Sequence, residues 1–127
     1  MRTYVYAGLS ARTGGSISGL FRRAPDSDRW NAGALPGDTH VHAITIHPDD
    51  PQVLYAATSS GLYRSRDQGM TWTRLVEPAA GEQMWSVLIH PSDHRVILTG
   101  CAPLGLYRSD DAGETWRRMP RPRSVSA

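Results

Sequence analysis

The fold of this chain is decided by the stretch Gly61-Leu62-Tyr63-Arg64-Ser65-Arg66-Asp67-Gln68-Gly69-Met70-Thr71-Trp72. It returns 44 residues later, at position 105 instead of 61, as Gly105-Leu106-Tyr107-Arg108-Ser109-Asp110-Asp111-Ala112-Gly113-Glu114-Thr115-Trp116. A second pair lies upstream, where Ile46-His47-Pro48-Asp49-Asp50 returns 43 residues later as Ile89-His90-Pro91-Ser92-Asp93. Self-similarity at a period of about 40 to 45 residues predicts a repeat architecture in which each copy is one structural unit.

A third and degenerate copy runs from Gly19-Leu20-Phe21-Arg22 to Trp30 and has the same length from glycine to tryptophan. It departs from the other two at four positions, which are occupied by Arg23, Pro25, Ser27 and Arg29 in place of Ser, Asp, Gly and Thr. Terminal repeats are commonly atypical because they cap an array. The sequence therefore predicts three units, of which this copy is the first.

Each unit is a series of short segments that are rich in β-branched and aromatic residues and are separated by turn residues, without helical periodicity. Strands are expected at 41–46, 53–58, 61–65 and 71–75, then at 84–89, 96–101, 105–109 and 115–118, and in the first unit at 4–9, near 20–22 and near 30. Four short strands per repeat are typical of a propeller blade. We predict an all-β fold, a partial β-propeller of about three four-stranded blades in an open array, with the inner strand missing from the first blade.

The predicted organisation is a single repeat domain at 1–119, with blades at about 1–35, 36–78 and 79–119, followed by a polar Arg/Pro/Ser tail at 120–127. Three blades are too few to close a propeller, which has about four to eight. We therefore expect either a homo-oligomer, in which a dimer supplies six blades, or additional blades from a longer chain. The Gly/Ser-rich segment 11–16 is expected to be a plain loop.

Charge and composition exclude several classes of function. All 14 basic residues are arginine, and four of them (Arg117, Arg118, Arg121 and Arg123) follow the last tryptophan, so the net charge of +2 becomes −2 without them. A nucleic-acid partner is not expected, since the folded body lacks a basic patch. No apolar run has the length of a signal peptide or a membrane span, so we expect a cytoplasmic chain with no membrane partner. Cys101 is the only cysteine and is expected to be a small buried side chain.

The two intact copies resemble the Asp box of sialidase-like, sortilin-like and related BNR-repeat propellers, and their surroundings are similar to bacterial YVTN-like propellers often described as glycosyl-hydrolase-like. The matching positions are Ser65, Asp67, Gly69, Thr71, Trp72 and Ser109, Asp111, Gly113, Thr115, Trp116. In that family the box forms the turn between the third and fourth strands, away from the active face. The residue chemistry also favours a structural turn, because a carboxylate accepts backbone N–H groups and glycine tolerates a positive φ.

Candidate ligand-binding residues lie where the innermost strands of the second and third blades begin. They are His40, His42, Gln83 and Trp85. His42 and Trp85 are repeat-equivalent positions with different chemistry, and Trp85 is expected to pack between blades rather than to stack on a sugar. We assign no metal and no cofactor, since His40 and His42 have no third ligand by spacing and His47 and His90 mark equivalent turns.

No catalytic residue is assigned. A sialidase-like enzyme needs an arginine triad, a tyrosine–glutamate pair and an aspartate, whereas Arg22, Arg64 and Arg108 are repeat-equivalent strand positions. The glutamates are Glu77, Glu82 and Glu114, and no motif pairs one of them with a tyrosine. We expect a non-catalytic binding or scaffold module for a carbohydrate or protein ligand. The alternative is a sialidase-like glycosyl hydrolase whose catalytic residues lie in blades outside this sequence.

Overall fold

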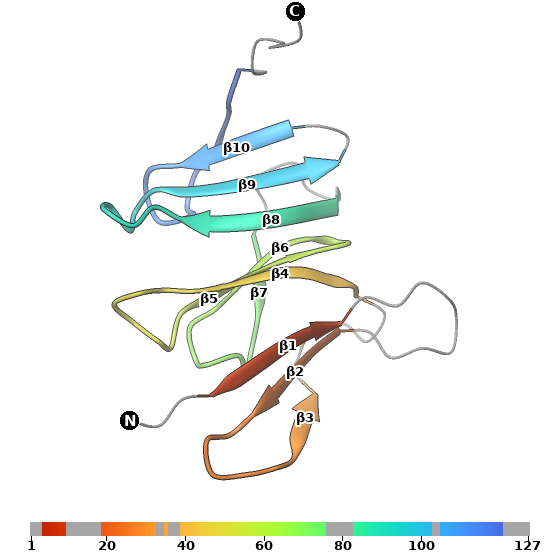
Figure 1. Ribbon diagram of the computed structural model, residues 1–127. Coiled ribbons are helices and arrows are strands. Elements are labelled where there is room, and N and C mark those ends of the chain that lie inside the picture. Colours follow the sequence, from red (N-terminus) through yellow and green to blue (C-terminus); the bar gives the residue numbers. More distant parts are fainter. Residues whose placement is uncertain are drawn as a thin grey trace, which may run out of the picture.

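The computed structural model describes residues 4–9, 19–32, 35, 39–75, 83–102 and 105–120. These residues form eleven strands in three antiparallel sheets that are stacked one on another in an open array (Figure 1). No helix occurs among them, and so none that is long and apolar enough to cross a membrane. The predicted fold class is confirmed, whereas the predicted loop at 11–16 and the tail from 121 onward lie outside the described residues.

Each sheet is a meander, in which strands adjacent in sequence are hydrogen-bonded neighbours. The first blade contains β1 (Val5–Leu9), β2 (Gly19–Arg23) and β3 (Trp30–Ala32). The second contains β4 (Val41–Ile46), β5 (Leu54–Thr58), β6 (Gly61–Ser65) and β7 (Thr73–Arg74). The third contains β8 (Gln83–Ile89), β9 (Ile97–Ala102), β10 (Gly105–Ser109) and β11 (Arg117–Arg118). The first sheet therefore has three described strands and the other two have four, as the sequence predicts.

The outermost strands are shorter than the sequence predicts. β7 spans two residues instead of 71–75, and β11 spans two instead of 115–118. The reason is that the recurrent Thr-Trp pair of each repeat belongs to the preceding turn: Thr71 N donates to Asp67 Oδ1 (2.8 Å) and Trp72 Nε1 donates to Gly69 O (3.1 Å). The backbone joins the sheet only after these bonds are made.

Two hydrophobic clusters hold the three sheets together. The first lies between the first and second blades and the second lies between the second and third. The middle sheet is covered on both faces, and accordingly every residue of β5 is buried. Cys101 is buried in the second cluster, as predicted. Since a fully buried aliphatic side chain contributes about 1.5–3 kcal/mol, packing between blades is the main source of stability in this fold.

The turns of each blade separate onto two sides of the stack. On one side, Gln68 N donates to Gln52 O (3.0 Å), so the turn after the third strand lies on the turn after the first. Ala112 N donates to Arg95 O (2.9 Å) in the same way in the third blade. We call this the box side. On the opposite side, Ser59 N donates to His40 O (2.9 Å), which places the start of β4 beside the turn between β5 and β6.

Candidate functional site

The two Asp boxes form the same hydrogen-bonded turn. In the first, Ser65 Oγ donates to Asp67 Oδ1 (2.8 Å) and accepts from Gly69 N (2.8 Å), while Asp67 also accepts from the amide and hydroxyl of Thr71. Ser109, Asp111, Gly113 and Thr115 repeat these contacts in the third blade. Trp116 Nε1 donates to Gly113 O (3.0 Å). The side chains of each box therefore accept from two backbone N–H groups of the same turn, those of Gly69 and Thr71 in the first box and those of Gly113 and Thr115 in the second.

The aspartates of the boxes are held as carboxylates. The hydroxyl of Thr71, followed by its backbone amide, lowers the pKa of Asp67 to about 2, and Thr115 does the same for Asp111, whose pKa is also about 2. A general acid works best when its pKa lies near the operating pH. Asp67 and Asp111 carry no proton to donate at neutral pH, and all their named contacts lie within the turn, which favours a structural role.

Each box docks onto the preceding blade through a left-handed residue. Ala112 has a φ of 61°, and its carbonyl accepts from Tyr55 Oη (3.0 Å) and Arg64 Nη1 (3.3 Å) of the second blade. At the other junction, Gln68 has a φ of 61°, and its carbonyl accepts from Tyr6 Oη (3.2 Å) and Arg22 Nη1 (2.9 Å). We call each Tyr–Arg–carbonyl set a box clamp.

The box clamps show what the repeated arginines do. Arg22 and Arg64 each hold the box of the next blade, and Arg64 also pairs with Glu114 (3.2 Å). Arg108 pairs instead with Asp110 of its own blade (2.8 Å). Burial raises the pKa of the Tyr55 hydroxyl, which therefore remains a protonated donor. These arginines do not converge on one point as a carboxylate-binding triad would.

On the side opposite the boxes, the structure brings together three of the four candidate ligand-binding residues. The rings of His42 and Trp85 are stacked with their centroids 3.9 Å apart and their planes at 22°. His42 Nε2 lies 3.3 Å from Gln83 Oε1. We call His42, Gln83 and Trp85 the His–Trp platform. His40 immediately precedes β4, and its backbone amide donates to Ser59 Oγ (3.0 Å).

A β-bulge in each innermost strand aims these rings toward each other. The register of β4 shifts between Val41 and Ala43, and the register of β8 shifts between Met84 and Ser86. His42 and Trp85 are therefore the extra residues at equivalent bulges. Bulges re-aim side chains and are over-represented next to active sites. Sequence reasoning placed both residues at strand starts but missed the bulges and the stacking.

Trp85 packs against the neighbouring blade, as expected, but it is not buried in the core. Its side chain is 50% exposed, although one ring face lies against His42. The bulge breaks the regular alternation of β8, so Trp85 stacks on His42 of the second blade without belonging to the buried cluster between these two blades. The exposed half of Trp85 is therefore available as an apolar surface, with the amide of Gln83 and the imidazole of His42 beside it.

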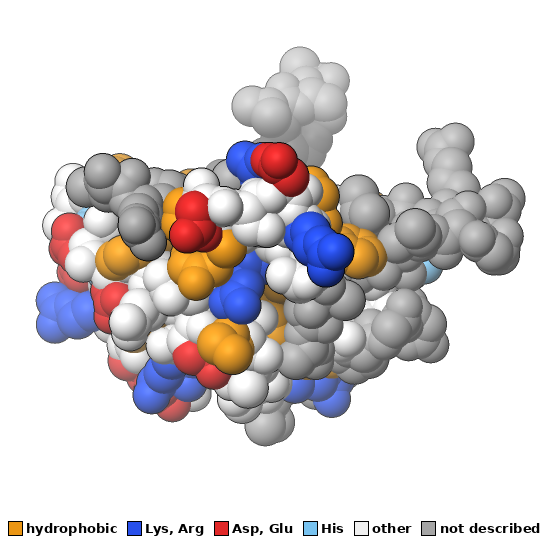
Figure 2. Space-filling view, turned by 90° about the horizontal axis from the view of Figure 1, so that it is seen from below, with side chains coloured by type: hydrophobic (Ala, Val, Ile, Leu, Met, Phe, Trp, Pro, Cys, Tyr) orange, Lys and Arg blue, Asp and Glu red, His pale blue; other side chains and the backbone are white. Residues whose placement is uncertain are grey.

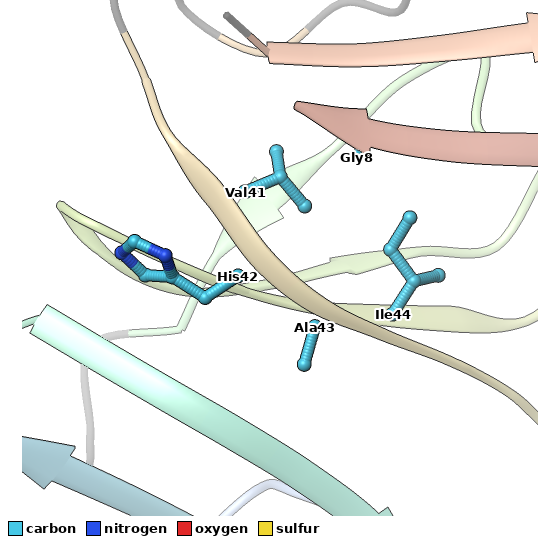
Figure 3. Close-up of a pocket in the computed structure, with 5 residues that line it drawn as sticks. All are labelled: Gly8, Val41, His42, Ala43 and Ile44. Atoms are coloured by element: carbon cyan, nitrogen blue, oxygen red, sulfur yellow. The ribbon is translucent and has the colours of Figure 1, made fainter. Parts of the chain in front are cut away.

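A small pocket adjoins the platform between β1 and β4 (Figure 3). It has a volume of about 150 Å³ and is lined by Gly8, Val41, His42, Ala43 and Ile44. Figure 3 shows Val41 and Ile44 pointing toward β1, whereas His42 points to the other side of β4. Ligand pockets for drug-sized molecules measure about 300–1,000 Å³. This pocket is too small for such a ligand, so the exposed platform is the better candidate.

The described carboxylates lie away from the platform, in the turns of the box side. Asp49 lies in the turn between β4 and β5, and Asp93 lies in the turn between β8 and β9. The two Asp boxes contain Asp67, Asp111 and Glu114. His94 Nδ1 lies 2.7 Å from Asp49 Oδ2, and the imidazoles of His47 and His90 accept from the amides of Asp49 and Ser92. Among the described residues, no three His, Cys, Asp or Glu side chains are gathered in a way that could hold a metal ion. Glu77 and Glu82 lie outside the described residues.

Comparisons with known proteins agree with the fold and with the two Asp boxes. The model of the BNR/Asp-box repeat matches residues 63–74 and 107–118. Xyloglucanase Xgh74A of Acetivibrio thermocellus is 29% identical over 85 residues, which cover 58% of this chain and 10% of that protein. The structure of an ancestral GH74 enzyme superimposes with a TM-score of 0.72 at 14% identity, covering 91% of this chain and 17% of the other. YCF48 from Cyanidioschyzon merolae superimposes with a TM-score of 0.62 at 24% identity, covering 80% and 34%.

These similarities support the fold and the repeat, and they are limited to part of each relative. The chain spans about a tenth of the xyloglucanase that it matches and less than half of either structural neighbour. Both intact Asp boxes predicted from the sequence are confirmed by the repeat model.

Proposed function

Because this chain consists of β-propeller blades with two BNR/Asp-box repeats, we propose that it is a non-catalytic binding module with a carbohydrate ligand on the His–Trp platform. The observation that carries the proposal is the inter-blade stack, in which Trp85 rests on His42 at 3.9 Å and is still 50% exposed. An aromatic face takes up the apolar face of a sugar ring, and adjacent amide and imidazole groups can bond its hydroxyls. The similarity to xyloglucanases favours a polysaccharide of that class.

The described residues of the platform favour binding over reaction. Glycoside hydrolysis ordinarily requires two carboxyl groups about 5–10 Å apart on either side of the scissile bond. The described carboxylates lie in turns of the box side, on the opposite side of the stack from the platform. An enzyme would need carboxylates from residues outside the described part of the chain or from further blades.

A titration with a xyloglucan oligosaccharide, followed by calorimetry, tests the proposal. Trp85→Ala removes the platform, and Met70→Ala is the control because Met70 is 61% exposed in the box turn, on the opposite side of the stack from the platform. Covering about 100 Å² of aromatic surface contributes about 2 kcal/mol, so Trp85→Ala should weaken binding about thirtyfold. Equal affinities of the two variants would refute a site on the platform.

The alternative of a glycosyl hydrolase is tested in the same samples. Incubation with xyloglucan should release no reducing ends from the wild-type chain. Release that persists through purification and is lost in Trp85→Ala would overturn the non-catalytic proposal. If the chain continues, further Asp boxes together with an arginine–tyrosine–glutamate set would also favour the sialidase-like enzyme. A chain that neither binds nor cleaves the saccharide would leave a protein ligand as the better candidate.

A further inference from the structure

The first and second blades each present the same kind of face to the next blade of the array. The face of the first blade toward the second, and that of the second toward the third, are built from equivalent positions in paired neighbouring strands. These positions are Tyr6, Gly8, Leu20 and Arg22 in the first blade and Tyr55, Ala57, Leu62 and Arg64 in the second. In the third blade the equivalent positions are Leu98, Gly100, Leu106 and Arg108. The third blade therefore carries a third copy of the docking face.

This third docking face is open among the described residues. Leu88 and Leu106 are 58% and 38% exposed. Leu88 is equivalent to Thr45 of the second blade, whose hydroxyl donates to Val87 O of the third (2.7 Å), so its position belongs to the blade junction. An exposed apolar face that is repeated from two buried junctions indicates an interface, since monomers seldom leave such patches uncovered.

The open face lacks the donors of a box clamp. Leu98 stands where the clamp has a tyrosine, and Arg108 is taken up by Asp110 of its own blade at 2.8 Å. Asp110 replaces Arg66 at this position of the repeat and is also contacted by Arg117 (3.5 Å). The third docking face therefore keeps its apolar residues but has no tyrosine or unpaired arginine to donate to a box carbonyl. It is complementary to a blade that presents no such carbonyl.

The outer face of the first blade is a face of that kind. Tyr6 and Arg22 point to the second blade, so the alternation of side chains along a strand places Phe21 and Arg23 on the outer face. Trp30 is the cross-strand partner of Arg23 and therefore lies on the same face, where its side chain is 47% exposed. Seen from this side, the molecule has hydrophobic side chains beside arginine and acidic side chains (Figure 2). The turn before Trp30 has no positive-φ residue among those described and so lacks the box carbonyl.

We infer that the outer face of the third blade docks on the outer face of the first blade of a second copy, so that two copies close a ring of six blades. At both internal junctions, one blade supplies the clamp donors and the next blade supplies the box carbonyl. At the proposed junction both are absent, because the third blade has no free clamp donor and the first blade has no box carbonyl. A two-fold axis that coincides with the central axis of the ring relates the two copies, so both new junctions are equivalent and the assembly closes. Six blades lie within the range of about four to eight found in propellers.

Light-scattering mass of the whole chain, measured over a range of concentrations, tests this inference. The wild type is expected at twice the chain mass of 14.0 kDa. Leu88→Glu and Trp30→Glu each place a charge in both junctions of a homodimer, so each variant alone is expected to be a monomer. Leu106→Glu is a second variant of the third blade, and circular dichroism checks that each variant is folded. Met70→Glu is the matched control, because Met70 is 61% exposed in the box turn and lies on neither face.

Mixing the two charged variants distinguishes the head-to-tail arrangement from the others. An equimolar mixture of Leu88→Glu and Trp30→Glu retains one intact junction, between the first blade of one chain and the third blade of the other. Dimers are therefore expected in the mixture and not in the separate samples. A wild-type monomer would overturn the inference and point to further blades as the occupant. A Trp30→Glu variant that remains dimeric would overturn it in favour of two third blades meeting, and a mass above the dimer would overturn closure at six blades.

Discussion

The box clamp makes a quantitative prediction about how blades are joined. The carbonyl of Ala112 accepts from Tyr55 at 3.0 Å and from Arg64 at 3.3 Å. Tyr55→Phe removes one donor and leaves the other, so we expect a loss of about 1 kcal/mol in the free energy of unfolding. Arg64→Met also removes the ion pair with Glu114, and since the arginine is only 12% exposed we expect a loss of about 1–2 kcal/mol.

The double variant should lose more than the sum of the single variants. Either donor alone satisfies the carbonyl, whereas removing both leaves a partly buried acceptor without its side-chain partners, which costs about 1–3 kcal/mol. We therefore expect a coupling energy of about 1 kcal/mol, in the sense that the second substitution is more harmful than the first. Urea unfolding followed by far-ultraviolet circular dichroism, at one fixed protein concentration, measures all four corners of the cycle.

A second double-mutant cycle repeats the test at the other internal junction, and a third serves as the control. Tyr6→Phe with Arg22→Met tests the clamp at the first junction, where both donors reach the Gln68 carbonyl, and should couple with the same sign. Leu98→Ala with Arg108→Met tests the equivalent positions of the third blade, where Arg108 is held by Asp110 and no shared acceptor exists among the described residues. Additivity within about 0.3 kcal/mol at both internal junctions would refute the clamp as the link between blades.

Two other predictions concern close packing and acid stability. Gly8→Ala should destabilise the fold by about 1–3 kcal/mol in the same urea assay, because the added Cβ would lie 2.5 Å from Val41 Cγ1. Gly100→Ala is the control and should cost less, because the nearest atom to its Cβ would be Ser86 Oγ, at 3.0 Å. Equal losses of stability in the two variants would contradict the close approach of β1 and β4. The pKa values of Asp67 and Asp111 are about 2 in the folded chain, below the ordinary 3.8, so their stabilisation is complete above about pH 5 and is lost as the pH falls through about 2. A variant with Asp67→Asn and Asp111→Asn should show a flatter fall in unfolding free energy between about pH 4 and pH 2, and an unchanged slope would exclude the boxes as its source.

The His–Trp platform shows where sequence reasoning stopped. His42 and Trp85 could be placed at equivalent strand starts, yet an ideal strand would turn every second residue inward, and Trp85 was expected in the core. A signal was present, because the apolar residues Val41 and Ile44 are three positions apart, as are Met84 and Val87. Such a spacing is one residue more than the strand period and is typical of a bulge. The stacking itself needed the second blade to lie beside the third.

The sequence by itself determined the number of blades, nearly every strand and the internal structure of each Asp box, because these depend on a repeat period and on contacts within about seven residues of one chain segment. Only the tertiary structure decided which groups meet across blades. These contacts are the clamp of Tyr55 and Arg64 on the Ala112 carbonyl and the stack of His42 on Trp85. The structure also shows that Arg108 contacts Asp110 instead of the box of another blade. Equivalent residues have similar sequence surroundings in each repeat. Their roles differ because each blade has a different neighbour, and in the third blade also because Asp110, which replaces Arg66, pairs with Arg108.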